Sequence, residues 1–135
     1  MPVMTDSTNA ASSLESPLAI VNAFIHALEQ RDVDTALTFL TGDVEYDNVP
    51  MRKVFGHDGV RESLAPFLAG CSEIEWVIHH EAATGNVVMN ERTDRFHLPH
   101  KWAEVQVVGL FVLRHGKIEL WRDYFDLAHA REQLS

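Results

Sequence analysis

The chain has 135 residues, of which 46% are hydrophobic and 23% are charged, and these values are typical of one globular domain. Its 20 acidic and 11 basic residues give a formal net charge of -9, which argues against a nucleic-acid or anionic-membrane partner. The single cysteine, Cys71, cannot form an internal disulfide. No apolar run is long enough to span a membrane, and no basic residue precedes Arg31, whereas a secretory signal would have a basic residue near its start. We therefore expect a soluble, cytoplasmic domain.

The first third of the chain predicts a polar tail followed by helices. Residues 1–15 are mostly small and polar, so they predict a flexible tail before one domain over residues 16–135. Ser16 and Pro17 are the residue types preferred at an N-cap and at the first helical position, and apolar residues follow at helical spacing. A second, short helix is predicted over residues 33–40.

The middle of the chain predicts one strand and one helix. Residues 43–50 form a short strand that runs into a loop and stops at a proline. Residues 57–70 form a helix for which Asp58 is the expected cap, and Pro66 should kink or shorten this helix.

From there to the end the hydrophobic period changes from helical to two, which predicts strands. Four strands are expected, followed by a short helix, over residues 73–81, 87–96, 102–114, 117–126 and 127–134. Helices followed by an antiparallel meander indicate the α+β class, with the helices packed on the concave face of a curved, mostly antiparallel sheet. The third of these strands is apolar on both faces, so a second subunit is expected to cover the outer face, which makes the protein a homodimer.

The strand at 87–96 is unusual because both of its faces are polar. Side chains alternate along a strand, so one face carries Asn90, Arg92 and Asp94, and the other carries Glu91, Thr93 and Arg95. A small domain normally gives at least one face of a strand to its core. The polar residues at 90–95 therefore need a partner or a function.

A second polar pair, Arg122 and Asp123, lies in an aromatic strand near the C-terminus, the segment "WRDYFD". A buried unpaired carboxylate is costly, whereas a carboxylate–arginine–carboxylate set can be satisfied together. Arg92, Asp94 and Asp123 are thus a candidate cluster across neighbouring strands. On spacing alone, a structural salt-bridge network and a catalytic site are about equally favoured. Tyr46 and Asn48, two residues apart on an extended segment, face the same way and could hold a water molecule between them.

Other residues give no sign of a metal or cofactor. The glycines fit neither the dinucleotide fingerprint nor the phosphate-binding loop. His79 and His80 are adjacent in a strand and should point to opposite faces, so we interpret the histidines as surface residues. Cys71 has no neighbour in sequence that would activate it, and a buried, inert thiol is expected.

The segments "YDNVP", "RTD" and "WRDYFD", in this order, resemble the limonene-1,2-epoxide hydrolase family. This family is a branch of the cystatin-like α+β cone folds that include ketosteroid isomerase and nuclear transport factor 2. The resemblance runs from about residue 17 to the end of the chain. It implies hydrolysis of a lipophilic epoxide, terpene-like or cyclic, to a vicinal diol in one step, without a cofactor or a metal.

The resemblance also implies roles for particular residues. Asp123 would be the general base that activates water, Tyr46 and Asn48 would hold that water, and Asp94 would protonate the epoxide oxygen. Arg92 would orient both carboxylates, and Trp121 would help to wall the substrate pocket. The alternative is a non-hydrolytic member of the same fold, either an isomerase or a module that binds a lipophilic ligand.

Overall fold

The computed structural model describes residues 15–135, so the tail predicted at residues 1–15 lies outside the described residues except for Glu15. The described chain forms four helices and six strands. The helices are α1 (Pro17–Glu29), α2 (Val33–Leu37), α3 (Gly56–Ala69) and α4 (Leu127–Leu134). The strands are β1 (Leu40–Asn48), β2 (Arg52–Phe55), β3 (Glu73–Thr84), β4 (Val87–Leu98), β5 (Lys101–Arg114) and β6 (Lys117–Tyr124).

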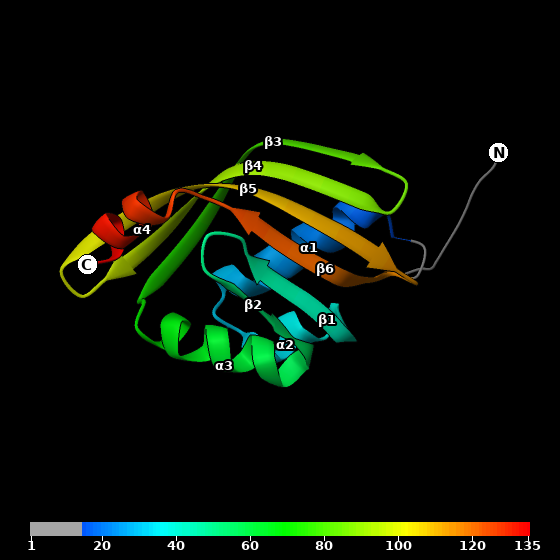
Figure 1. Ribbon diagram of the computed structural model, residues 1–135, viewed down its shortest axis with the longest axis horizontal. Coiled ribbons are helices and arrows are strands. Elements are labelled where there is room, and N and C mark those ends of the chain that lie inside the picture. The colour runs from blue at the N-terminus through cyan, green and yellow to red at the C-terminus, as the bar shows by residue number, and fades with distance from the viewer. Residues whose placement is uncertain (1–14) are drawn as a thin grey trace.

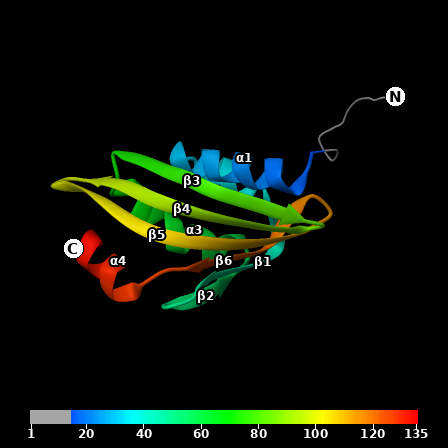
Figure 2. The same ribbon diagram turned by 90° about the horizontal axis from the view of Figure 1, so that it is seen from above.

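The six strands form one curved sheet in the order β2-β1-β6-β5-β4-β3. All neighbouring pairs are antiparallel except β1 and β6, which run parallel. Helices α1 and α3 lie on the concave side of the sheet, and α4 lies beside the first residues of β5 (Figures 1 and 2). The α+β class and the mostly antiparallel sheet predicted from the sequence are confirmed.

Helix α1 begins where the sequence predicts. The Oγ of Ser16 accepts a hydrogen bond from the N–H of Ala19 at 3.1 Å, and Pro17 occupies the first turn, where its missing N–H costs nothing. The apolar stripe of α1 is buried against the sheet through Ile20, Val21, Phe24, Ile25, Ala27 and Leu28. Burial of this stripe, rather than helix propensity, provides most of the stability of the helix.

The prediction was wrong about residues 33–55 in two respects. Helix α2 ends at Leu37 instead of residue 40, because Leu40 already pairs with Ile118 of β6 as the first residue of β1. Strand β2 was missed altogether, since the sequence predicts only a loop after the strand at residues 43–50. Its side chains are mostly exposed, so it has no alternating apolar pattern and is defined only by its pairing with β1.

Helix α3 also differs from the prediction. Its N-cap is Phe55, which makes no side-chain cap bond, and Asp58 lies inside the first turn rather than at the cap. There its negative charge lies near the positive end of the helix dipole. The helix continues past Pro66 to Ala69, so Pro66 does not end it.

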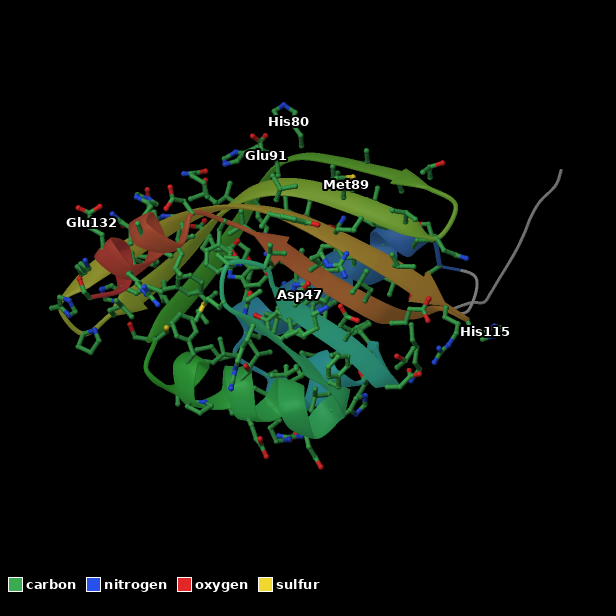
Figure 3. All side chains as sticks on the ribbon, viewed as in Figure 1. Asp47, His80, Met89, Glu91, His115 and Glu132 are labelled. Carbon is green, nitrogen blue, oxygen red and sulfur yellow. The ribbon has the colours of Figure 1, made fainter. Side chains whose placement is uncertain are left out.

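Strand β3 extends to Thr84, further than predicted, and contains a bulge between Ile78 and His80. The bulge inserts one extra residue, so His79 and His80 both contact the outer face of β4, through Thr93 and Glu91 respectively. The expectation that these two histidines point to opposite faces was therefore wrong. Figure 3 shows His80 and Glu91 projecting from the side of the sheet that is opposite to the helices.

Candidate active site

Strand β4 carries the polar residues that the sequence singled out, and its two faces have different surroundings. Asn90, Arg92 and Asp94 are buried on the concave face. On the convex face Arg95 forms ion pairs with Glu75 of β3 and Glu104 of β5. The convex residues thus pair with polar side chains of the neighbouring strands, whereas the concave residues point into the space between the sheet and the helices.

The guanidinium of Arg92 is fully buried and bridges two carboxylates. Its Nε donates to Oδ1 of Asp94 at 2.7 Å, and its Nη2 lies 3.3 Å from Oδ2 of the same residue. Nη2 also lies 2.9 Å from Oδ2 of Asp123, which comes from β6. The face of the guanidinium lies 4.3 Å from the centre of the Trp76 ring. The predicted cluster of Arg92, Asp94 and Asp123 therefore exists in the fold.

The two oxygens of Asp123 have different environments. Oδ2 contacts Arg92 and also accepts a hydrogen bond from Nε1 of Trp121 at 3.2 Å. Oδ1 is buried and has no hydrogen-bond partner among residues 15–135. A buried carboxylate oxygen without a partner is costly, so a water molecule is the group that suits this position.

Tyr46 and Asn48 lie beside Asp123 because β1 runs parallel to β6. In this register Asn48 is opposite Asp123, and Tyr46 is opposite Trp121. The Tyr46 ring stacks on Trp121 with 3.7 Å between ring centres, which fixes the direction of its hydroxyl. The two residues predicted to hold water thus neighbour Asp123 in the sheet and line the same cavity as its side chain.

A cavity of about 440 Å³ opens onto these groups. Its polar and charged lining residues are Tyr46, Asn48, Ser63, Asp94, Asp123, Arg131 and Ser135. The remaining lining is largely apolar and comes from helices α1, α3 and α4, from the sheet and from the turn after β1; it includes Leu28, Met51, Leu64, Phe67, Leu68, Trp76, Phe96, Val105, Val107, Phe125, Leu127, Ala130 and Leu134. Few polar groups in an apolar cavity of this size are typical of a site for a small organic molecule.

Trp121 does not line this cavity, in contrast to the role that the sequence suggested. It is completely buried behind Tyr46, where it supports Tyr46 by stacking and Asp123 by its hydrogen bond. Trp76 of β3 lines the cavity instead. Trp76 was not among the residues predicted for the site, and the signal that points to it is the β3–β4 register, in which Trp76 lies directly opposite Asp94.

Burial dominates the electrostatics of the site. It raises the pKa of Asp94 to about 7, although the positive charge of Arg92 acts in the opposite direction. Burial also raises the pKa of Asp123, against the effect of Arg92 and of the Trp121 hydrogen bond, and it raises the pKa of Tyr46. Burial alone would lower the pKa of Arg92, but the two carboxylates outweigh it and raise this pKa. Burial therefore opposes ionisation of both carboxyls, while the two carboxyls keep the arginine charged.

Other features of the described part of the chain do not indicate a metal site or a reactive cysteine. No group of three or more His, Cys, Asp or Glu side chains within residues 15–135 is arranged to hold a metal ion. Cys71 is buried, as predicted, and burial raises the pKa of its thiol. Over the same residues, no helix has the length and apolar character needed to cross a bilayer.

Comparison with known proteins first defines the fold and then the family. An NTF2-like protein of unknown function from Burkholderia pseudomallei K96243 is similar with a TM-score of 0.78, at 18% identity over 93% of this chain and 99% of that chain. This level of identity supports only the cone-shaped fold.

Closer similarities identify the family. Residues 15–134 match the limonene-1,2-epoxide hydrolase catalytic domain. Epoxide hydrolase EphG of Mycobacterium tuberculosis (strain ATCC 25618 / H37Rv) is 37% identical over 108 residues, which are 79% of this chain and 71% of that protein. The solved structure of an LEH-like epoxide hydrolase from M. tuberculosis has a TM-score of 0.77 at 33% identity, over 87% of this chain and 88% of that chain. The chain belongs to the limonene-1,2-epoxide hydrolase family, and this membership supports epoxide hydrolase activity.

Proposed function

We propose that this protein hydrolyses a small lipophilic epoxide to a vicinal diol in one step, by paired-carboxylate acid–base catalysis without a cofactor. The observation that carries the proposal is the environment of Asp123. One of its oxygens is held by Arg92 and Trp121, while the other is buried and has no partner within residues 15–135, and Tyr46 and Asn48 line the same cavity. A general base for water requires such a free oxygen next to groups that can orient the water.

The proposed reaction has two coupled proton transfers. Water held by Tyr46 and Asn48 gives a proton to Oδ1 of Asp123 while its oxygen forms a bond to one epoxide carbon. The bond between that carbon and the epoxide oxygen breaks, and the oxygen takes its electron pair and the proton of Asp94. The product is a vicinal diol. The proton left on Asp123 then returns to Asp94 through solvent, which restores the starting state.

The roles of the two carboxyls are assigned by their neighbours, because burial raises the pKa of both. The water-holding pair lies beside Asp123 and not beside Asp94, so Asp123 is the base. Asp94 lines the same cavity with a pKa of about 7 and can therefore remain protonated near neutral pH, as an acid requires. Each such proton transfer commonly contributes a factor of roughly 10²–10⁴ to the rate.

Arg92 is proposed to keep both carboxyls in place without taking part as an acid. Its raised pKa keeps it charged, and its planar fork contacts both partners at once. Because one positive charge serves two carboxyls, it compensates for only one negative charge. The second carboxyl is therefore favoured as the neutral acid.

The lining of the cavity supports an apolar substrate of modest size. Apart from the reacting groups, mostly aliphatic and aromatic side chains surround the 440 Å³ space. A terpene-like or cyclic epoxide fits this largely apolar lining, in which burial of a charged group without a partner would be costly. A panel of monocyclic terpene oxides, cycloalkene oxides and longer lipid epoxides, with chiral analysis of the diols, identifies the preferred substrate.

The same panel tests the proposal against a non-hydrolytic alternative. We expect turnover of at least one epoxide in the presence of EDTA, and loss of turnover in Asp123→Asn, whose amide cannot accept the proton from water. Binding of the epoxides without diol formation by the wild-type protein would instead favour a ligand-binding module. Turnover that survives in Asp123→Asn would contradict the assignment of the base.

We also propose that the protein is a homodimer through the convex face of the sheet. Met89, Val108 and Tyr124 are 48%, 40% and 45% exposed on adjacent strands of this face, and Figure 3 shows Met89 pointing away from the helices. Partly exposed Leu110 and Val112 adjoin them. An apolar patch in the middle of a polar sheet face is typical of an isologous subunit contact.

A further inference from the structure

Arg92 has a third partner besides the two carboxyls. Its Nη1 donates to Oδ1 of Asn90 at 2.8 Å. Asn90 is 3% exposed on the concave face of β4 and does not line the cavity. Nη1 is also the guanidinium nitrogen that contacts neither Asp94 nor Asp123. Asn90 thus binds the end of the guanidinium that the carboxyls leave free.

Gly109 of β5 lies directly under this hydrogen bond. In the sheet it pairs with Asn90 on one side and with Asp123 on the other, so the three residues form one row across β4, β5 and β6. A Cβ atom at Gly109 would lie 2.9 Å from Oδ1 of Asn90 and nearer still to Nη1 of Arg92. Real Cβ atoms do not approach other atoms this closely, so a side chain at position 109 would displace the guanidinium.

We propose that Asn90 and Gly109 are positioning residues that hold Nη1 of Arg92 away from Asp123. Asp123 lies at the far end of the same row, and its Oδ1 has no partner within the described chain. If Asn90 did not accept Nη1, the buried N–H groups would need another acceptor. The free oxygen of Asp123 is such an acceptor, and a guanidinium that turned toward it would take the position of the catalytic water. Asn90 therefore keeps the base free, and Gly109 provides the space for this arrangement.

A purely structural role would have different consequences. If Asn90 only satisfied a buried donor, its loss would lower stability and leave the catalytic rate of the folded protein unchanged. If it positions Arg92, its loss lowers kcat while KM changes little, because the apolar walls that bind the substrate are intact. This distinction rests on the proposed epoxide hydrolysis. The orientation of Arg92 itself can be measured without any substrate.

The first experiment is nitrogen-15 NMR of the arginine side chains in the folded, full-length protein. In the wild type, Nη1 and Nη2 of Arg92 have different partners, so we expect two separate Nη resonances with slow exchange. Asn90→Leu keeps the approximate volume but removes the acceptor, and Gly109→Ala displaces the guanidinium from the other side. Both variants should shift or merge these resonances. Asn90→Asp keeps an acceptor oxygen in place and should retain two resonances.

Kinetics of the same variants provide the second experiment. Asn90→Leu and Gly109→Ala should each lower kcat by about 10- to 100-fold, with KM within about twofold of the wild type. The double variant should lose little more than either single variant, because both changes break the same hydrogen bond. Asn22→Leu is the matched control, since it makes the same substitution at an asparagine whose buried amide oxygen has no partner within residues 15–135, on α1 outside the cavity lining.

Unchanged Arg92 resonances in both single variants would overturn the proposal, as would an unchanged kcat in folded protein. If Asn90→Leu does not fold, Gly109→Ala alone decides the question by the same two measurements. If the wild type hydrolyses no epoxide, the proposed function fails. The NMR experiment then still decides whether Asn90 and Gly109 fix the orientation of Arg92.

Discussion

Asp94→Asn is predicted to become more stable relative to the wild type as the pH rises. Burial raises the pKa of Asp94 from 3.8 to about 7 in the folded protein. The unfolded chain therefore loses this proton near pH 3.8, whereas the folded protein keeps it until about pH 7. Between these values the unfolded state binds fewer protons, so the stability that the proton provides is present below pH 3.8 and is lost as the pH rises through 7.

The size of the effect follows from the two pKa values. At about 1.4 kcal/mol per pH unit, the difference between 3.8 and about 7 corresponds to about 4 kcal/mol in total. Part of this loss has already occurred at pH 5, so roughly 2–3 kcal/mol remains between pH 5 and pH 8. The asparagine variant has no such titration. It also loses part of the hydrogen bonding to Arg92, at about 1–3 kcal/mol, but this cost is the same at both pH values.

The assay is urea unfolding of both proteins at pH 5 and pH 8, with the free energies of unfolding compared as a double difference. The variant should gain about 2–3 kcal/mol on the wild type between the two pH values. Asp34→Asn, on the exposed Arg61–Asp34 pair, serves as a control for the removal of one negative charge from an acidic protein. A double difference near zero would refute the reasoning, because Asp94 would then be ionised throughout and could not be the acid.

Three further results are expected. The kcat/KM of the wild type should fall as the pH rises through about 7, because the free enzyme then loses the proton of Asp94; a constant value up to pH 9 would contradict its role. Tyr46→Phe should lower kcat by roughly 10- to 100-fold, since Asn48 and Asp123 still hold the water, and steady-state kinetics will test this. Light scattering at micromolar concentration should show a dimer that Met89→Arg converts to a monomer. A monomeric wild type would show that no second subunit covers the convex face.

The sequence predicted the parts of the fold that depend on local chemistry. Ser16 and Pro17 located the start of α1, and the period of two in β4 placed Arg92 and Asp94 on one face. It failed where tertiary pairing decides the structure. Strand β2 has no apolar alternation of its own and is defined by β1, and the end of α2 is set by the pairing of Leu40 with β6.

The candidate site was predicted as a set of residues but not as an arrangement. The clustering of Arg92, Asp94 and Asp123 could be proposed because buried charges need partners. The burial of Trp121 behind Tyr46 could not be predicted, because strand alternation gives the face on which a side chain lies but not which other side chain covers it. The position of Gly109 under the Arg92–Asn90 bond depends on the register of three strands, which spacing along the chain does not determine.

The proposed mechanism requires that water, and not a protein carboxylate, attacks the epoxide. Hydrolysis in ¹⁸O-labelled water under single-turnover conditions tests it most directly, with mass spectrometry of both the diol and the peptides that contain Asp94 and Asp123. One labelled oxygen is expected in the diol and none in the protein. Label on either carboxylate, with an unlabelled diol from the first turnover, would indicate a covalent ester and contradict the account.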